Sequence, residues 1–310
     1  MPADWPDVIV PVQTLSDSGI TYVPQQYIRP LSERPIGNNT ATKSNTCDWG
    51  FFQVVNHGVD LDAVKRMRQV WKEFFNLPVE QKKLYANSPM SYEGYGSRVG
   101  VDKEAILDWN DYYFLTLLPT ETTIPEKWLS APSNLRDVTE KYTFHMMNLS
   151  SLLLKAISNT LELDEEHLNM AFGGSHGITA SMRVTYYPKC PQPDLTLGLS
   201  PHTDIGGITL LLLDDNNVAG TQVRKENEWV TLQPMPGAFI INVGDQIQII
   251  SNGKYKSAEH RVLANSDEER LSIAFFCNPG GDLPIAPASK LVSPISPAQY
   301  HPTTFNEYRK

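Results

Sequence analysis

Two histidines and one aspartate in the second half of the chain have the residue types and spacing of a metal site. His202 and Asp204 are separated by one residue, and His260 begins the predicted strand HRVLA farther along the chain. Side chains two apart on an extended segment point to the same face, so His202 and Asp204 can bind one ion. Without His260, this pair would equally describe a loop that binds no metal. The three side chains together form the two-histidine, one-carboxylate triad that holds non-haem Fe(II) and leaves other coordination positions open.

An arginine and a serine that follow the triad could bind an acid. Arg270 and Ser272 are two residues apart at the predicted strand LSIAFF, so they face the same side of that strand. A guanidinium group binds a carboxylate as a bidentate fork, and a neighbouring hydroxyl adds another donor. The pattern therefore indicates a clamp for a small dicarboxylate. His57, in VVNHGV, is interpreted as a structural residue at a strand end.

The composition is that of an ordinary globular protein, and it excludes several classes. The chain has 310 residues, a mass of 34.8 kDa, 41% hydrophobic and 20% charged residues, a formal net charge of −9 and a pI near 5.3. An acidic chain of this kind is not expected to bind nucleic acid. No stretch approaches the roughly 20 apolar residues of a membrane span, and the start does not resemble a signal peptide. Cys47, Cys190 and Cys277 lie far apart and are interpreted as reduced thiols of a cytoplasmic protein.

The hydrophobic pattern predicts helices in the first half of the chain and strands in the second. Residues 37–46 are expected to form a loop, and a buried strand is predicted at 51–55. Amphipathic helices are predicted at 61–75 and 135–163. Turn residues between 179 and 278 separate short β-rich runs, which are MRVTYY, GITLLLL, TQVR, EWVTLQ, AFIINV, QIQIIS, HRVLA and LSIAFF. We therefore expect a mainly β fold, a sandwich or barrel with flanking helices.

Longer stretches around the triad resemble one enzyme family. YYPKCPQPDLTLGLSPHTDIGGITLLLLDD contains the first two triad residues, and NVGDQIQIISNGKYKSAEHRV and ERLSIAFFCNP contain the third and the Arg-x-Ser pair. Together with WGFFQVVNHGV, they resemble the plant 2-oxoglutarate- and Fe(II)-dependent dioxygenases over nearly the whole chain. The resemblance implies a double-stranded β-helix, or jelly roll, with flanking helices. It also implies Fe(II), with 2-oxoglutarate and O₂ as cosubstrates and ascorbate as a reductant.

The resemblance assigns roles to individual side chains. Fe(II) would be held by His202, Asp204 and His260, and the distal carboxylate of 2-oxoglutarate by Arg270, Ser272 and Tyr187. The family usually has Asn-Tyr-Tyr-Pro around the tyrosine, and this chain has Thr185 in place of the asparagine. Threonine keeps a hydroxyl but lacks the amide, so we expect a weaker hold on the cosubstrate. Beyond the metal ligands, the resemblance implies no catalytic residue.

Two further stretches narrow the substrate. SYEGYGSRVG and LDWNDYYFLTLLP resemble the jasmonate-induced oxygenases, which hydroxylate jasmonic acid. The substrate arginines would be Arg183 and Arg309, with Arg98 as a third basic candidate, and the pocket would be lined by Tyr112, Phe114 and Phe276. An ion pair could equally explain Arg183, and core packing could explain Tyr112 and Phe114. Oxidation of a flavonoid, a coumarin precursor or another specialised metabolite stays open, and the expected partner is a small molecule, with no nucleic acid or membrane.

The chain departs from the family at both ends. We expect a helix-rich N-terminal region at 1–175, an Fe(II)- and 2-oxoglutarate-binding jelly-roll core at 176–280 and a shortened C-terminal tail at 281–310. One strand and one helix of the family are expected to be missing before Trp49. A shortened, non-catalytic isoform is therefore the alternative to an active dioxygenase.

Overall fold

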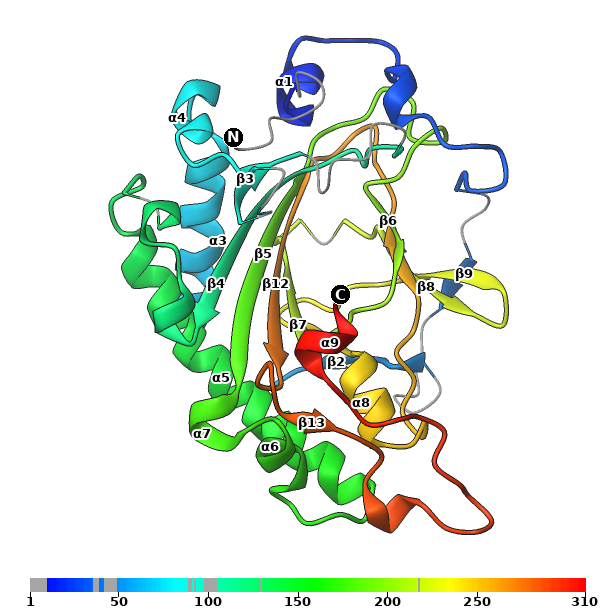
Figure 1. Cartoon of the computed structure of the whole chain (residues 1–310). Coiled ribbons are helices and arrows are strands. Elements are labelled where there is room, and N and C mark those ends of the chain that lie inside the picture. Colours follow the sequence, from blue (N-terminus) through cyan, green and yellow to red (C-terminus); the bar gives the residue numbers. More distant parts are fainter. Residues whose placement is uncertain are drawn as a thin grey trace.

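Two β-sheets face each other, and helices cover the outer side of the larger sheet (Figure 1). The structure is a computed structural model that describes residues 10–35, 39–41, 49–88, 91, 93–97, 105–128, 130–216 and 218–310. The predicted fold, a jelly-roll core with a helical N-terminal region, is confirmed.

The larger sheet has seven strands in the order β2-β10-β7-β12-β5-β4-β3, and all neighbouring strands are antiparallel. The strands span Phe51–Val54 (β2), Gly94–Gly96 (β3), Asp111–Leu118 (β4), Thr179–Tyr187 (β5), Ile208–Leu213 (β7), Phe239–Val243 (β10) and Arg270–Asn278 (β12). Strands β2, β3 and β4, from the first part of the chain, thus share one sheet with the core strands. The division of the chain at residues 175 and 280 stays a prediction.

The smaller sheet has five strands in the order β1-β9-β8-β11-β6. They span Asn39–Ala41 (β1), Leu199–His202 (β6), Thr221–Lys225 (β8), Glu228–Leu232 (β9) and His260–Val262 (β11), and Pro284–Ile285 (β13) pairs separately with Thr303–Thr304 (β14). The prediction of a loop over residues 37–46 was wrong at β1, which pairs in parallel with β9 and forms the edge of the smaller sheet. Backbone pairing with a distant strand leaves no periodic signal in so short a segment. The prediction that one strand and one helix of the family are missing before Trp49 stays a prediction, because residues 36–38 and 42–48 lie outside the described residues.

The helices lie mostly on one side of the molecule, beside the larger sheet (Figure 1). They span Val12–Asp17 (α1), Leu61–Phe75 (α3), Val79–Lys83 (α4), Leu135–Thr160 (α5), His167–Ala171 (α6), Gly174–Gly177 (α7), Asp245–Ile250 (α8) and Phe305–Tyr308 (α9), with 3₁₀ turns at Gln25–Tyr27, Thr120–Thr122, Pro125–Lys127 and Ser289–Leu291. The predicted helix at 61–75 is confirmed at both ends, and the one predicted at 135–163 ends slightly earlier. Helix α3 packs on α5, and α5 contacts β7 and β12.

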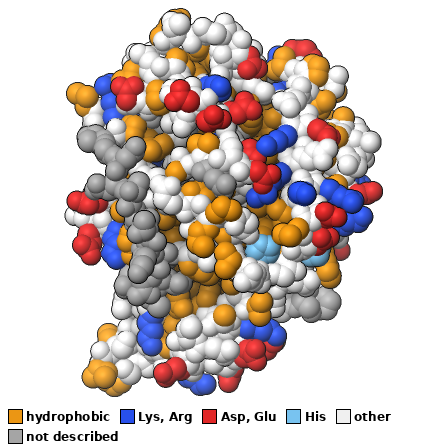
Figure 2. Space-filling model, turned by 180° about the vertical axis from the view of Figure 1, so that it is seen from behind, with side chains coloured by type: hydrophobic (Ala, Val, Ile, Leu, Met, Phe, Trp, Pro, Cys, Tyr) orange, Lys and Arg blue, Asp and Glu red, His pale blue; other side chains and the backbone are white. Residues whose placement is uncertain are grey.

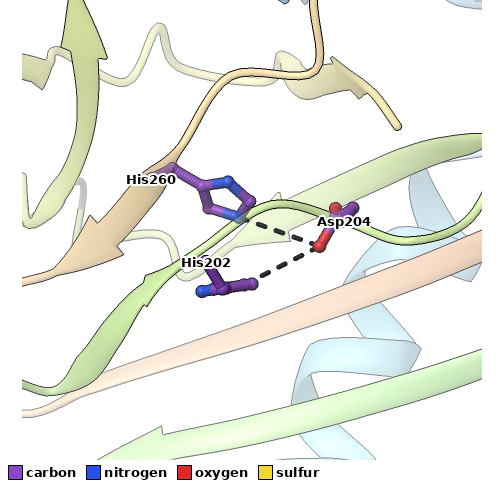
Figure 3. A group of neighbouring side chains, drawn as sticks. All are labelled: His202, Asp204 and His260. Atoms are coloured by element: carbon purple, nitrogen blue, oxygen red, sulfur yellow. Dashed lines mark ion pairs between the residues drawn. The ribbon is translucent and has the colours of Figure 1, made fainter. Parts of the chain in front are cut away.

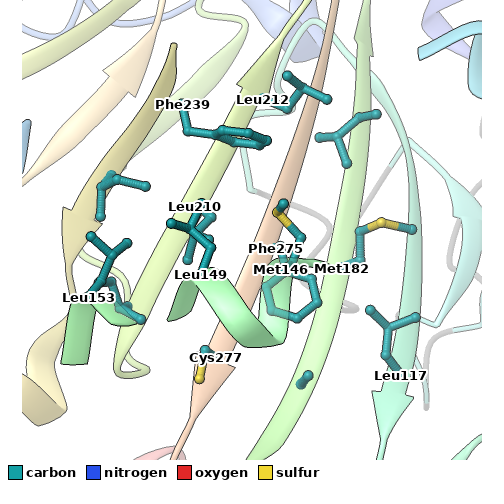
Figure 4. Close-up of a cluster of buried hydrophobic side chains, with 14 of the residues drawn as sticks. Leu117, Met146, Leu149, Leu153, Met182, Leu210, Leu212, Phe239, Phe275 and Cys277 are labelled. Carbon is teal, nitrogen blue, oxygen red and sulfur yellow. The ribbon is translucent and has the colours of Figure 1, made fainter. Parts of the chain in front are cut away.

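The central strands of the larger sheet pack one face against the helices and turn the other face to a cavity. On β5 and β12 the side chains that pack with the helices are Ala180, Met182, Val184, Tyr186, Leu271, Ile273, Phe275 and Cys277. Figure 4 shows part of this core, with Met146 and Leu149 of α5 against the sheet. Because successive side chains of a strand point to opposite faces, the residues between them face the cavity between the two sheets.

The strand predicted for QIQIIS was wrong, because this run forms α8. Its isoleucines are buried at positions 247, 249 and 250, a spacing that fits a strand and a short helix alike. The backbone N–H groups of Asp245 and Gln246, at the start of α8, donate to the carbonyl oxygens of Asp204 and Gly206. These long-range hydrogen bonds satisfy the first N–H groups of a helix, and they are invisible to sequence periodicity.

One face of the molecule is shown in Figure 2, with hydrophobic side chains gathered near the middle and charged side chains around them. Among the helices in the described part of the chain, none has the length and apolarity that crossing a membrane requires.

A buried carboxylate ties the N-terminal helix to the larger sheet. Asp111, at the start of β4, is completely buried and accepts hydrogen bonds from the N–H groups of Val12 and Gln13, each at 2.8 Å. The hydroxyl of Ser97 also donates to it. Burial raises the pKa of Asp111 above its ordinary value, and these three donors act in the opposite direction. The carboxylate therefore caps α1 from a distant strand.

Replacing Asp111 with alanine is expected to lower the free energy of unfolding by about 3–5 kcal/mol, because buried N–H donors lose their acceptor. Urea denaturation of the purified protein measures this change. Asp137→Ala, in the exposed first turn of α5, is the matched control and should cost at most about 1 kcal/mol. Equal losses in the two variants would contradict the anchoring role of Asp111.

Candidate functional site

The three triad side chains converge next to the smaller sheet (Figure 3). His202 ends β6 and His260 begins β11, and the two residues are direct partners across the antiparallel pair. Asp204 lies in the turn just beyond β6. Oδ1 of Asp204 is 3.7 Å from Nε2 of His202 and 3.9 Å from Nε2 of His260. The ligand atoms lie within 4.8 Å of one another, so one ion can contact all three.

Both imidazole rings are held with Nε2 toward the centre of this group. Nδ1 of His202 donates to the carbonyl oxygen of Ser200 at 2.8 Å, and Nδ1 of His260 to that of Ala258 at 3.2 Å. A carbonyl oxygen only accepts, so each Nδ1 carries the proton and each Nε2 keeps a lone pair. Burial lowers the pKa of His260 to about 4, so its ring is neutral at pH 7 and able to bind a cation.

Two polar side chains orient the carboxylate of Asp204. Its Oδ2 accepts hydrogen bonds from the hydroxyl of Thr209 at 2.5 Å and from the amide of Asn242 at 2.6 Å. Burial opposes ionisation, but the imidazoles of His260 and His202 and these hydrogen bonds keep the pKa of Asp204 below its ordinary value. The other oxygen, Oδ1, lies nearest the two imidazoles, so it can serve as the single carboxylate ligand of a metal ion.

The turn that carries Asp204 is fixed by the first residues of α8. The N–H of Asp245 donates to the carbonyl oxygen of Asp204 at 2.8 Å, and the N–H of Gln246 to that of Gly206 at 2.9 Å. A Cβ at Gly244 would lie 2.4 Å from the carbonyl oxygen of Gly206, so only glycine allows this approach. The helix that was predicted as a strand is therefore what holds the turn in place.

A cavity of about 1060 Å³ lies between the two sheets and includes the triad. The register of β4, β5 and β12 arranges its wall in successive rows, which are Tyr187–Arg270, Tyr112–Thr185–Ser272, Phe114–Arg183–Ala274 and Thr116–Ser181–Phe276. Arg309, just past α9, lines the cavity as well. The predicted site residues are thus brought together, except Arg98, which lies outside the described residues.

Arg270 places an uncompensated positive charge at one end of this wall. Its side chain is buried, with Cζ 4.6 Å from the centre of the Tyr187 ring, and Nη1 donates to the hydroxyl of Thr221 at 3.3 Å. Its Nη2 is buried without a hydrogen-bond partner in the part of the chain that the structure describes. Burial lowers the pKa of Arg270 from its ordinary value. Because a buried charge without a partner is costly, this end of the cavity is suited to an anionic ligand.

Arg183 is a second cationic group on the same wall. Its Cζ lies 4.3 Å from the centre of the Tyr112 ring, and its Nε and Nη2 donate to the hydroxyl of Thr185 and the amide oxygen of Asn110. Both acceptors are neutral, and no described carboxylate lies within ion-pair distance of Arg183. Tyr112 is buried from solvent and also lines the cavity, so the two explanations for it, core packing and substrate contact, are compatible.

Several residues of the site were missed from the sequence. Thr209 and Asn242 orient Asp204 from predicted strands, and Asn110 contacts Arg183 from the residue before β4, where no strand was predicted. The polarity of Thr209 and Asn242 inside apolar runs was a signal, but Asn242 and Asn110 lie 38 and 73 residues from their partners, too far to be identified by spacing. His57, in contrast, contacts Phe239 and the carbonyl oxygen of Gly237 at the end of β2, away from the cavity.

The donor set fits an iron ion and an acidic ligand side by side. Two imidazoles that turn Nε2 toward one point and a monodentate carboxylate suit Fe(II), whereas a closed structural zinc site would require a fourth protein ligand. The unpartnered Nη2 of Arg270 supplies an independent reason to expect a carboxylate in the same cavity.

Comparisons with known proteins agree with this chemistry. The family model of the 2OG-Fe(II) oxygenase superfamily matches residues 178–279. A second family model, for the N-terminal region of the non-haem dioxygenase in morphine synthesis, matches residues 43–134. The chain is 49% identical to Jasmonate-induced oxygenase 1 of Arabidopsis thaliana, over 98% of this chain and 83% of that protein. It is 47% identical to Jasmonate-induced oxygenase 4 of the same plant, over 98% and 93%. The crystal structure of JOX2 in complex with 2OG, Fe and JA superposes with a TM-score of 0.92 and 50% identity, over 99% of this chain and 94% of that one.

Replacing His260 with alanine is expected to weaken divalent-metal binding by at least about 100-fold. Loss of a partner behind a ligand already costs about 10–100-fold, and loss of the ligand itself should cost more. Titration of the metal-free protein with Co(II), followed by its visible absorption, measures the affinity. His301→Ala, an exposed histidine away from the triad, should titrate like the unmodified protein. Undiminished Co(II) binding by His260→Ala would show that the triad is not the metal site.

Proposed function

We propose that this chain, which belongs to the 2OG-Fe(II) oxygenase superfamily, hydroxylates jasmonic acid. It is an Fe(II)- and 2-oxoglutarate-dependent dioxygenase. When bound, the iron with 2-oxoglutarate and O₂ supplies the oxidation of a substrate C–H bond, while 2-oxoglutarate is converted to succinate and CO₂. The residues of this chain bind and orient the participants.

We assign the metal to the triad. His202, Asp204 and His260 would hold Fe(II) through two Nε2 atoms and one carboxylate oxygen. The hydrogen bonds at each Nδ1 and at Oδ2 of Asp204 support this assignment, because they fix the three ligand atoms before the metal arrives. Preorganised ligands of this kind lose little conformational freedom on binding.

We assign the distal carboxylate of 2-oxoglutarate to the row that contains Arg270. The two guanidinium nitrogens, one of them unpartnered, can form the bidentate fork that a carboxylate prefers. Ser272 and Tyr187 flank this position and would add hydroxyl donors, and Thr185 lies beside Ser272 in the next row. Ascorbate as a reductant stays a prediction.

The substrate assignment rests on one observation: arginines and aromatic side chains line the same cavity as the triad. Arg183 and Arg309 would bind the carboxylate of jasmonic acid, and the apolar body would pack among Tyr112, Phe114 and Phe276. The relatives with nearly half of their residues identical are named jasmonate-induced oxygenases, and JOX2 was crystallised with JA. A small acid with an apolar ring complements this combination of charge and hydrophobic surface.

Replacing Arg270 with lysine is expected to raise the KM for 2-oxoglutarate roughly 10- to 100-fold, because a point charge replaces a bidentate fork. Steady-state turnover at saturating substrate and O₂ measures the constant. Arg224→Lys is the matched control, since Arg224 is exposed and lies outside the cavity, and it should leave the KM unchanged. A KM in Arg270→Lys equal to that of the unmodified enzyme would contradict the clamp.

Replacing Arg183 with alanine is expected to raise the KM for jasmonic acid roughly 10- to 100-fold, because one charged hydrogen-bond partner is lost. The methyl ester lacks the carboxylate, so its KM should change little. Product formation measured by mass spectrometry gives both constants, and Arg66→Ala, on the exposed side of α3, is the control.

Equal losses with the acid and the ester would remove the carboxylate-binding role of Arg183. If the unmodified enzyme consumes 2-oxoglutarate with a flavonoid or a coumarin precursor but not with jasmonic acid, the substrate assignment is wrong and the dioxygenase activity stands.

A further inference from the structure

Thr185 occupies the boundary between the two ligand positions of the cavity. It is 3% exposed, and in the sheet it pairs with Tyr112 of β4 on one side and with Ser272 of β12 on the other. Arg183 is two residues away on the same strand, so the two side chains share the cavity face. Thr185 is also the position at which this chain lacks the asparagine of the Asn-Tyr-Tyr-Pro pattern.

The hydroxyl of Thr185 is engaged with Arg183. Its Oγ1 accepts a hydrogen bond from Nε of Arg183 at 3.2 Å. The guanidinium also lies over the Tyr112 ring, with Cζ 4.3 Å from the ring centre, and Nη2 reaches Oδ1 of Asn110 at 3.4 Å. The contact to Thr185 is therefore the shorter of the two polar contacts, and Nε is the guanidinium nitrogen nearest the strand.

The geometry of these contacts limits where the guanidinium can point. Stacking on Tyr112 fixes the plane of the group, but a ring face alone permits rotation within that plane. An acceptor at Nε removes this freedom and keeps the Nη edge, which carries the donors for a bidentate carboxylate, turned away from Thr185. A long arginine side chain otherwise loses substantial conformational entropy when a ligand binds it.

We propose that Thr185 is a positioning residue for Arg183 and sets the preference of this enzyme for a carboxylate-bearing substrate. This inference rests on the proposed function, in which Arg183 binds the substrate carboxylate. It changes the role of Thr185 from a contact to 2-oxoglutarate into a support for the substrate arginine. A hydroxyl that accepts from Nε keeps its own proton available for an oxygen of a bound ligand.

Thr185→Val and Thr185→Ser separate the hydroxyl from the shape of the side chain. Valine keeps the branched shape and removes the acceptor, whereas serine keeps the acceptor. Anaerobic protein loaded with Fe(II) and 2-oxoglutarate is titrated with jasmonic acid or its methyl ester, and the visible charge-transfer band reports binding without turnover. Thr185→Val should weaken acid binding about tenfold, the effect of one hydrogen bond to a charged group. Ester binding and the Kd for 2-oxoglutarate should change less than about twofold, and serine should restore acid binding.

A double-mutant cycle tests whether the effect passes through the arginine. In an Arg183→Ala background, Thr185→Val should have no further effect on acid binding, because the group it positions is gone. A full additional tenfold loss in that background would overturn the proposal. So would equal weakening of acid and ester, or a raised Kd for 2-oxoglutarate with unchanged acid binding, which would return Thr185 to the cosubstrate.

Crystal structures of the unmodified protein and of Thr185→Val test the positioning without any substrate. The guanidinium should keep Nε toward Thr185 in the unmodified protein and rotate over the Tyr112 ring or become disordered in the variant. An unmoved guanidinium would overturn the proposal even if jasmonic acid proves not to be a ligand. Failure of the unmodified protein to bind jasmonic acid, with the guanidinium displaced in the variant, would instead contradict the proposed function alone.

Discussion

Burial of one face of the seven-stranded sheet against the helices constrains everything on its other face. Met182, Val184 and Phe275 are among the side chains held in this core, and each buried side chain of this size contributes roughly 1.5–3 kcal/mol. A slip of β5 by a single residue would move Met182 and Val184 into the cavity and force Arg183 against the helices. The apolar core therefore fixes the register, and the register places the polar residues of β5 and β12 in the cavity.

Two arginines that line the cavity have no carboxylate as a hydrogen-bond partner among the described residues. The chain as a whole has a formal net charge of −9, yet the described hydrogen-bond acceptors of Arg270 and Arg183 are neutral. Burying such groups opposes folding to some degree, because they lose hydration without gaining a counter-ion. An acidic ligand supplies a counter-ion for these arginines, so its binding gains an electrostatic attraction that the folded protein alone does not have. Because one row of the wall separates Arg270 from Arg183, the two arginines can bind two different carboxylates.

The turn that carries Asp204 is connected through α8 to the C-terminal segment that contains Tyr308 and Arg309. The carboxylate of Asp245, whose N–H fixes Asp204, also accepts hydrogen bonds from Tyr308 at 3.0 Å and Thr203 at 3.3 Å. Tyr308 ends α9, and the next residue, Arg309, lines the cavity. One buried side chain thus links the turn that carries Asp204 to the segment that carries Arg309.

The sequence by itself determined the chemistry of the site and the main pattern of the fold. His202, Asp204 and His260 could be identified because only a few residue types bind iron and because His-x-Asp on an extended segment has a fixed local geometry. The helix at 61–75 followed from its 3.6-residue period, and β12 from a short β-rich run bounded by turn residues. The tertiary structure alone decided that QIQIIS is a helix and that the guanidinium of Arg183 lies between Thr185 and Tyr112. The helix depends on hydrogen bonds to a distant turn, and the guanidinium depends on an aromatic ring of a neighbouring strand. Contacts between such distant segments leave no periodic signal in the sequence.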